Sequence, residues 1–166
     1  MNKLFTVLAL VFLLSKVSLA QTQSIETFKS LGHEDDAIYG MSGASSFYIK
    51  VSPLTEMNGS KLVLYFEPSQ ALIKEHSFIN VIINNKPVYS ARLTKDSIQK
   101  VSIALSSSDL SPDKFLKIQV KTLLTITDDI CRDLDNPAMW LKVKDYSYLS
   151  LINNYKNLMS NVNISN

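Results

Sequence analysis

A single cysteine, Cys131, is the most informative scarcity in this sequence. One cysteine cannot form a disulfide within the chain, so the fold depends on its apolar core, and burial is the commonest state of such a thiol. Glycine occurs only 4 times, which excludes collagen-like and other glycine-rich fibrous proteins. Charged residues make up 19% and hydrophobic residues 46% of the 166 positions, a composition typical of one globular domain rather than of disorder.

Residues that carry enzyme chemistry are also scarce. The two histidines, His33 and His76, have no partners at metal-site spacing. The chain has no Gly-x-Ser-x-Gly elbow and no phosphate loop, and no spacing pairs two carboxylates as a glycosidase requires. Asp133, Asp135 and Asn136 lack the glycine and distal glutamate of a calcium-binding loop, so a solvated loop is the better interpretation. The sequence predicts a protein that is not an enzyme and holds no metal or cofactor.

The N-terminus carries the longest apolar run. A basic start over residues 1–3 precedes an uncharged stretch over residues 4–14, and the small residues Ser18 and Ala20 precede Gln21. This order predicts a signal peptide over residues 1–20 that is cleaved before Gln21, because the run is too short to span a bilayer comfortably. An uncleaved membrane anchor is the alternative.

Removal of that segment lowers the formal net charge of the chain from +2 to zero. Lys3 and Lys16 lie within it, so fifteen basic and fifteen acidic side chains remain in the mature chain. A neutral mature chain argues against a nucleic-acid partner, which would require a clustered basic surface. It is compatible with an uncharged partner such as a polysaccharide.

Short alternating or β-branched apolar runs dominate the rest of the chain. They predict an all-β, jelly-roll-like β-sandwich of seven to eight short strands. Asn84-Asn85 is expected to form a two-residue hairpin turn. We expect a polar leader over residues 21–30, the sandwich domain over 31–151 and an asparagine-rich tail or linker over 152–166. The expected strands cover residues 47–51, 61–66, 78–83, 88–93, 101–105, 115–124 and 148–151.

Several segments in this order carry a family resemblance. They are LYFEPSQAL at 64–72, SFINVIINNKPV at 77–88, CRD at 131–133, WLKV at 140–143 and YSYL at 146–149. The set resembles the first carbohydrate-binding domain of the family of bacterial cellulose synthase regulatory subunits, over residues 31–151. One departure is Asn84-Asn85, where the family usually has an Asn-Gly turn.

The resemblance implies a non-catalytic periplasmic role, peripheral to the inner membrane. The implied partners are the catalytic subunit of cellulose synthase and the nascent glucan. Family members are longer, so we expect this chain to be a fragment, a split gene product or a short relative. Such proteins are often described as binding cyclic di-GMP, a ligand that normally requires arginine or lysine clamps. Arg92 and Arg132 are the only arginines, and they form no such motif.

Aromatic side chains are the natural candidates for sugar binding, because a ring offers a flat apolar face and Tyr and Trp add a polar edge. The candidate residues are Trp140, Tyr146, Tyr148 and Tyr89. Tyr146 and Tyr148 share one strand face, whereas a lone tryptophan such as Trp140 is more often packed in the core. A freestanding exported adhesin or assembly subunit that acts through protein contacts is the alternative function, and a small secreted glycosidase is a third.

Overall fold

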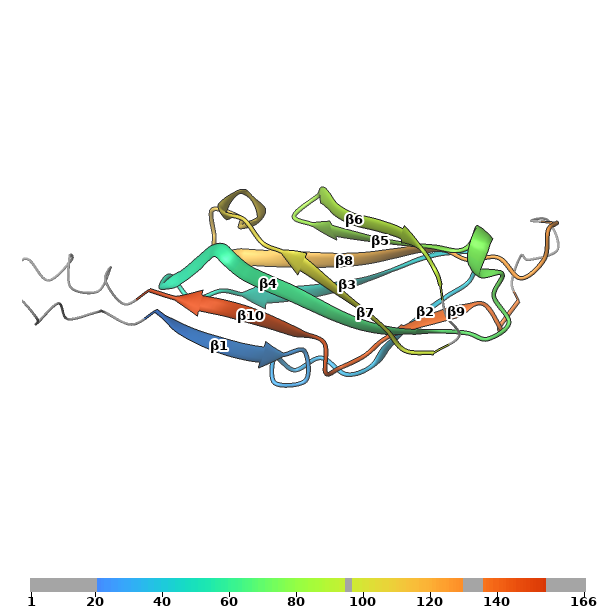
Figure 1. Cartoon of the computed structure of the whole chain (residues 1–166), viewed down its shortest axis with the longest axis horizontal. Helices are drawn as coiled ribbons and strands as arrows, with labels where there is room; N and C mark the ends of the chain where they lie inside the picture. Colours follow the sequence, from blue (N-terminus) through green and yellow to red (C-terminus); the bar gives the residue numbers. More distant parts are fainter. Residues whose placement is uncertain (1–20, 95–96, 130–135, 155–166) are drawn as a thin grey trace, which may run out of the picture.

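Two antiparallel β-sheets stacked face to face make up the protein (Figure 1). The structure is a computed structural model, and it describes residues 21–94, 97–129 and 136–154. The helical elements within these ranges are two 3₁₀ turns, η1 (Lys74–His76) and η2 (Ser107–Asp109). Among the described residues, no helix is long and apolar enough to cross a membrane.

The larger sheet has six strands organised around one long strand, β4 (Thr55–Pro68). Along one side β4 pairs first with β10 (Tyr148–Asn153) and then with β9 (Trp140–Val143). Along its other side it pairs with β7 (Gln99–Ala104). The strands β1 (Thr22–Thr27) and β2 (Asp36–Tyr39) complete the sheet by pairing with β10 and β9.

The smaller sheet has the strand order β3, β8, β5, β6. Its bounds are Ser42–Lys50 for β3, Phe115–Leu123 for β8, Phe78–Ile83 for β5 and Lys86–Arg92 for β6. Asn84 and Asn85 join β5 to β6 with φ values of 46° and 68°. Two consecutive positive φ values are the signature of a type I′ hairpin, a turn that asparagine tolerates because its short polar side chain bonds locally.

The core lies between the two sheets and follows from strict alternation within strands. On β4, Leu62, Leu64 and Phe66 point inward, each at most 3% exposed. Ile79 and Val81 of β5 do the same from the opposite sheet. Because side chains alternate between faces along a strand, every inward residue leaves its neighbours on the outer face of its sheet. The outer faces are therefore the large surfaces available for binding.

A buried carboxylate joins η2 to the smaller sheet. The Asp109 side chain is 3% exposed and accepts hydrogen bonds from the backbone N–H and hydroxyl of Ser106 at 2.8 and 2.7 Å. Lys86 Nζ lies 2.9 Å from its other oxygen. Burial raises the pKa of Asp109, but the hydrogen bonds from Lys86 and Ser106 outweigh burial and hold the pKa below its usual range.

The sandwich prediction is confirmed, and each of the seven expected runs coincides with a strand. Three further strands, β1, β2 and β9, bring the described ranges to ten. Residues 22–27, which were expected to belong to a loose polar leader, instead form β1, and Thr22 pairs with Asn153. Residues 1–20, Cys131, Arg132, Asp133, Asp135 and residues 155–166 lie outside the described ranges, so the expected signal peptide and most of the expected tail do too.

Candidate functional site

Aromatic side chains gather on the outer face of the six-stranded sheet. We call the set of Tyr39, Trp140, Tyr65, Tyr146 and Tyr148 the aromatic row. Tyr39 lies in β2, Trp140 in β9, Tyr65 in β4 and Tyr148 in β10, and Tyr146 lies in the turn between β9 and β10. These elements include segments that are distant in the sequence and are brought together by the sheet. The row therefore depends on the fold and on no single sequence motif.

The alternation of β4 places Tyr65 on the outer face of the six-stranded sheet. Val63, Tyr65 and Glu67 share the outer face, whereas the residues between them point into the core. Tyr148 lies directly opposite Val63 in the neighbouring strand β10. Val63 is 4% exposed although it lies outside the core cluster, which indicates that outer-face side chains cover it.

Three of the rings form one cluster. The Tyr65 and Tyr146 centroids are 5.0 Å apart with an interplanar angle of 58°, and the Tyr65 and Tyr148 centroids are 6.5 Å apart at 37°. Aromatic pairs at these separations stabilise one another while leaving part of each ring free for a ligand. The Tyr146 side chain is the most accessible of the three, with 40% of its surface exposed.

Trp140 and Tyr39 extend the row toward the far end of the sheet. The two residues are directly opposite each other in β9 and β2. The Trp140 carbonyl accepts a hydrogen bond from the Ser69 N–H at 3.0 Å, so Trp140 lies beside Ser69. Ser69 is four residues after Tyr65 in the sequence. At about 3.3 Å per strand residue, roughly 13 Å separate the two parts of the row. Tyr39 is 64% exposed and Trp140 is half-buried.

Cations flank the rings on both sides. Lys100 Nζ lies 5.4 Å from the centroid of Tyr65, and Lys142 Nζ lies 5.7 Å from the centroid of Trp140. A cation at this distance is attracted to the ring face. A hydrogen bond to Tyr65 raises the pKa of Lys100. The row thus combines apolar ring faces with hydrogen-bond donors at its rim.

An ion-pair cluster braces the turn that carries Tyr146. The Lys144 ammonium binds the Asp35 carboxylate and lies 3.7 Å from the Glu67 carboxylate. The Lys144 N–H donates to the Tyr65 carbonyl at 2.9 Å, and the Asp145 N–H donates to Asp35 at 2.8 Å. Partial burial raises the pKa of Asp35, but hydrogen bonds from Lys144 and Asp145 outweigh it and hold the pKa below its usual range. The hydrogen bond to Asp35 raises the pKa of Lys144.

The structure brings together three of the four residues proposed from the sequence. Trp140, Tyr146 and Tyr148 lie on one face, although the two parts of the row are separated along it. Tyr89 does not join them, because it lies opposite the buried Val81 in the other sheet and packs against the core.

Sequence reasoning missed Tyr65, the residue that contacts both other tyrosines of the cluster. A signal for it exists in the β4 segment. Lys61 and Glu67 are each an even number of residues away from Tyr65 along β4, so the three side chains point to the same face. The two charged residues identify that face as the outer one.

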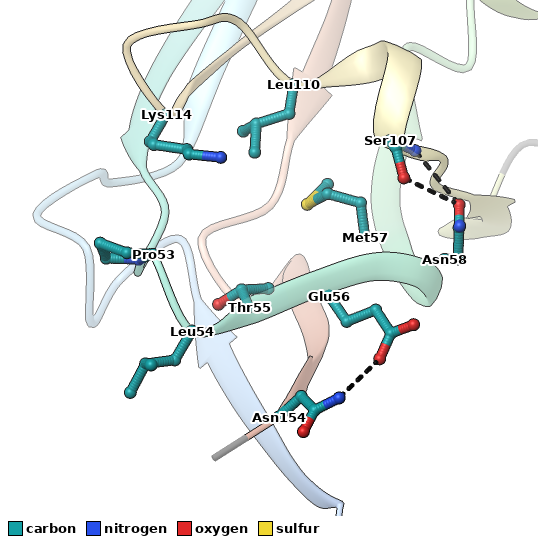
Figure 2. Close-up of a pocket in the computed structure, with 10 residues that line it drawn as sticks. All are labelled: Pro53, Leu54, Thr55, Glu56, Met57, Asn58, Ser107, Leu110, Lys114 and Asn154. Carbon is teal, nitrogen blue, oxygen red and sulfur yellow. Dashed lines mark hydrogen bonds between the residues drawn. The ribbon is translucent and has the colours of Figure 1, made fainter. Parts of the chain in front are cut away.

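A separate hollow opens where β4 begins, with a volume of about 380 Å³ (Figure 2). Its polar groups bond to one another: the Asn154 amide donates to Glu56 at 3.5 Å, and Ser107 donates to the Asn58 amide oxygen through its N–H at 3.2 Å and its hydroxyl at 3.3 Å. None of its ten lining residues is aromatic, so it offers a sugar ring no stacking surface. The lining residues are Pro53, Leu54, Thr55, Glu56, Met57, Asn58, Ser107, Leu110, Lys114 and Asn154.

The two stacked antiparallel sheets place the protein among the β-sandwich domains, in which loops and outer faces carry the binding sites. The chain belongs to the family described as "Cellulose synthase BcsB, first CBM domain", whose family model matches residues 21–154. A CBM is a carbohydrate-binding module, so family membership supports a carbohydrate-binding role. It also confirms the resemblance found in the sequence. No curated protein matches the chain.

Several solved structures are similar in outline. The CBM36-1 domain of a multidomain xylanase from the hindgut metagenome of Trinervitermes trinervoides is 12% identical, with a TM-score of 0.43 over 78% of this chain and 96% of that one. The xylan-binding module CBM15 is 9% identical, with a TM-score of 0.38 over 81% of this chain and 97% of that one. A family two carbohydrate esterase from Cellvibrio japonicus is 14% identical, with a TM-score of 0.37 over 81% of this chain and 34% of the esterase.

Proposed function

We propose that the aromatic row binds a single neutral glucan chain. The observation that carries this proposal is the cluster of Tyr65, Tyr146 and Tyr148 with cations at its rim, in a chain whose family is a carbohydrate-binding one. Sugar rings present apolar C–H faces that pack on aromatic rings, while their hydroxyl rims bond to polar groups. Because the rings are tilted by 37–58° to one another, they suit one twisted chain better than a flat crystalline surface.

The proposed role is binding without catalysis. Asp35 and Glu67 lie beside the turn that carries Tyr146, and both face Lys144. A glycosidase needs one carboxylic acid whose pKa is raised so that it keeps its proton, and the pKa of Asp35 is lowered. The ion pair with Lys144 stabilises the charged form of the Asp35 carboxylate and holds the turn in place. A carboxylate that stays ionised has no proton to donate to a glycosidic oxygen.

In the cell, we place the protein in the periplasm beside cellulose synthase, where the row would hold the glucan as it emerges. Family membership and the N-terminal sequence support this placement. The proposed partners are therefore the nascent glucan and the catalytic subunit of the synthase, with the domain peripheral to the inner membrane.

A titration of the purified chain with cellohexaose tests the proposal. Trp140 is the only tryptophan, so tryptophan emission reports on one end of the row without interference. We expect a saturable change in that emission, together with amide chemical-shift changes in β4, β9 and β10. Microcrystalline cellulose should bind less protein than soluble or amorphous glucan.

Two outcomes would contradict the assignment. If cellohexaose changes neither the Trp140 emission nor any chemical shift, the chain does not bind the glucan. If the shifts map to β3, β5 and β8 instead, the chain binds glucan on the wrong face for this proposal. Release of shorter sugars from cellohexaose would contradict the non-catalytic role.

A further inference from the structure

The outer face of the four-stranded sheet differs in charge from the rest of the molecule. Its outward positions on β3, β8, β5 and β6 hold four cations and no carboxylate. The cations are Lys50, Lys117, Lys121 and Arg92. We call this surface the basic face. Although the mature chain is expected to be neutral, the outer face of its four-stranded sheet is positively charged.

The cations are spread across the sheet and are not neutralised. Within the described residues, none of the four forms an ion pair. Lys117 and Lys121 both point outward from β8, and the register of the strand puts them roughly 13 Å apart. Lys117 Nζ lies 5.6 Å from the centroid of the Tyr48 ring, and the Arg92 guanidinium lies 5.4 Å from that of Phe78. The face therefore pairs open positive charge with aromatic surface.

Hydrogen-bonding groups occupy the middle of the same face. Gln119 lies between the two lysines of β8, and its amide donates to the Ser46 hydroxyl at 3.4 Å. Asn80 lies directly opposite Lys121 on β5. Amides beside a ring and a lysine are the groups that bind sugar hydroxyls and carboxylates. The strongly exposed apolar residues of β8, Phe115 and Leu123, lie at its opposite ends.

This arrangement argues against a lipid surface as the partner. A protein that lies on a bilayer needs a continuous apolar patch that enters the headgroup layer. Here Phe78 and Leu123 are opposite each other at one end of the sheet, and polar positions of β8 separate them from Phe115 at the other end. The basic face also has a limit. Arg92 lines a cleft of about 460 Å³ together with Glu75 and Asp128, so negative charge is present at that end.

We propose that the basic face binds an acidic polysaccharide, a linear chain whose carboxylates lie over the lysines of β8 while its rings contact Tyr48. Charge complementarity carries the proposal, because four unpaired cations favour a polyanion and repel a basic partner. This site is independent of the aromatic row, since the two surfaces are the outer faces of opposite sheets. One domain would then hold a neutral glucan on one side and an acidic polysaccharide on the other.

Affinity electrophoresis and calorimetry with polygalacturonate, a linear polyuronate, test this site. We expect binding that weakens steeply as salt is raised, because exposed charges are screened. The double variant Lys117→Gln/Lys121→Gln should bind about tenfold more weakly. The matched control Lys29→Gln/Lys61→Gln loses the same charge elsewhere and should bind like the unaltered chain. Tryptophan emission on cellohexaose addition should be the same in the unaltered chain and in Lys117→Gln/Lys121→Gln, which separates this test from that of the aromatic row.

Three results would overturn the proposal. Equal loss in both double variants would mean that net charge, and not the basic face, governs binding. Binding to phosphatidylglycerol vesicles without binding to polygalacturonate would identify a lipid surface as the partner. The absence of any polygalacturonate binding at low salt would show that the face does not take acidic polysaccharides.

Discussion

Replacing Tyr146 by alanine removes the most accessible ring of the tyrosine cluster. The side chain lies in the turn between β9 and β10 and is 40% exposed, so its loss opens no core cavity. An aromatic side chain buries about 150–250 Å² in full, so a ligand that covers the exposed part of Tyr146 buries roughly 60–100 Å². At about 25 cal/mol per Å², this area is worth about 1.5–2.5 kcal/mol.

The expected consequence of Tyr146→Ala is a dissociation constant for cellohexaose that rises about tenfold to sixtyfold. Isothermal titration calorimetry measures the constant directly, and the Trp140 emission provides a second readout. Tyr48→Ala is the matched control, because Tyr48 is 59% exposed on the outer face of the other sheet and should leave the constant unchanged. If Tyr146→Ala changes affinity less than twofold while Tyr48→Ala weakens it, the assignment of the glucan to the aromatic row is wrong.

The remaining predictions concern stability. A Cβ on Gly43 would overlap Ile38 Cγ2, so Gly43→Ala should lower the free energy of unfolding by about 1–3 kcal/mol in urea denaturation. Asn85→Gly should raise it by about 0.5 kcal/mol, because glycine adopts the φ of 68° without strain. Because folding lowers the pKa values of Asp35 and Asp109, the stability they contribute is present above about pH 4 and is lost as the pH falls below it. Asp109→Asn should lower stability by about 1–3 kcal/mol at neutral pH and make the acid dependence measured by circular dichroism shallower.

The strands that sequence patterns predict are those with several inward-facing apolar residues. β8 shows a full alternation of four buried and five outward residues, and its prediction needs no other information. β2 has one fully buried residue, Ile38, and β1 has none, so neither produces a periodic signal. These short strands form because the neighbouring strands present free backbone groups, which is a tertiary effect that a local pattern does not contain.

The site was partly predictable for a similar reason. Tyr146 and Tyr148 were expected to share one strand face, but Tyr146 lies in the turn before β10, and the two rings meet because both contact Tyr65. Tyr89 points inward because of one register shift between β5 and β6. Counting back from the two-residue turn puts Val88 opposite Val81 and Tyr89 outward, but the register shift between Val81 and Ile82 moves Tyr89 to the inward position.

The positive charge of the basic face could not be predicted from the composition of the chain. The expected mature chain sums to zero, and that sum conceals the basic face. Net charge alone does not show whether basic residues share a face, and the alternation of β3 and β8 places Lys50, Lys117 and Lys121 on the same side.

The pairing of Thr22 with Asn153 sets how the domain responds to mechanical load. Because β1 and β10 run antiparallel, the start of β1 and the end of β10 lie side by side at one end of the sandwich (Figure 1). A force that pulls these two points apart acts across the ladder and loads its hydrogen bonds one pair at a time. Such a ladder opens like a zipper at low force. Opening of this ladder detaches β1 first and leaves β4, and with it Tyr65, in place.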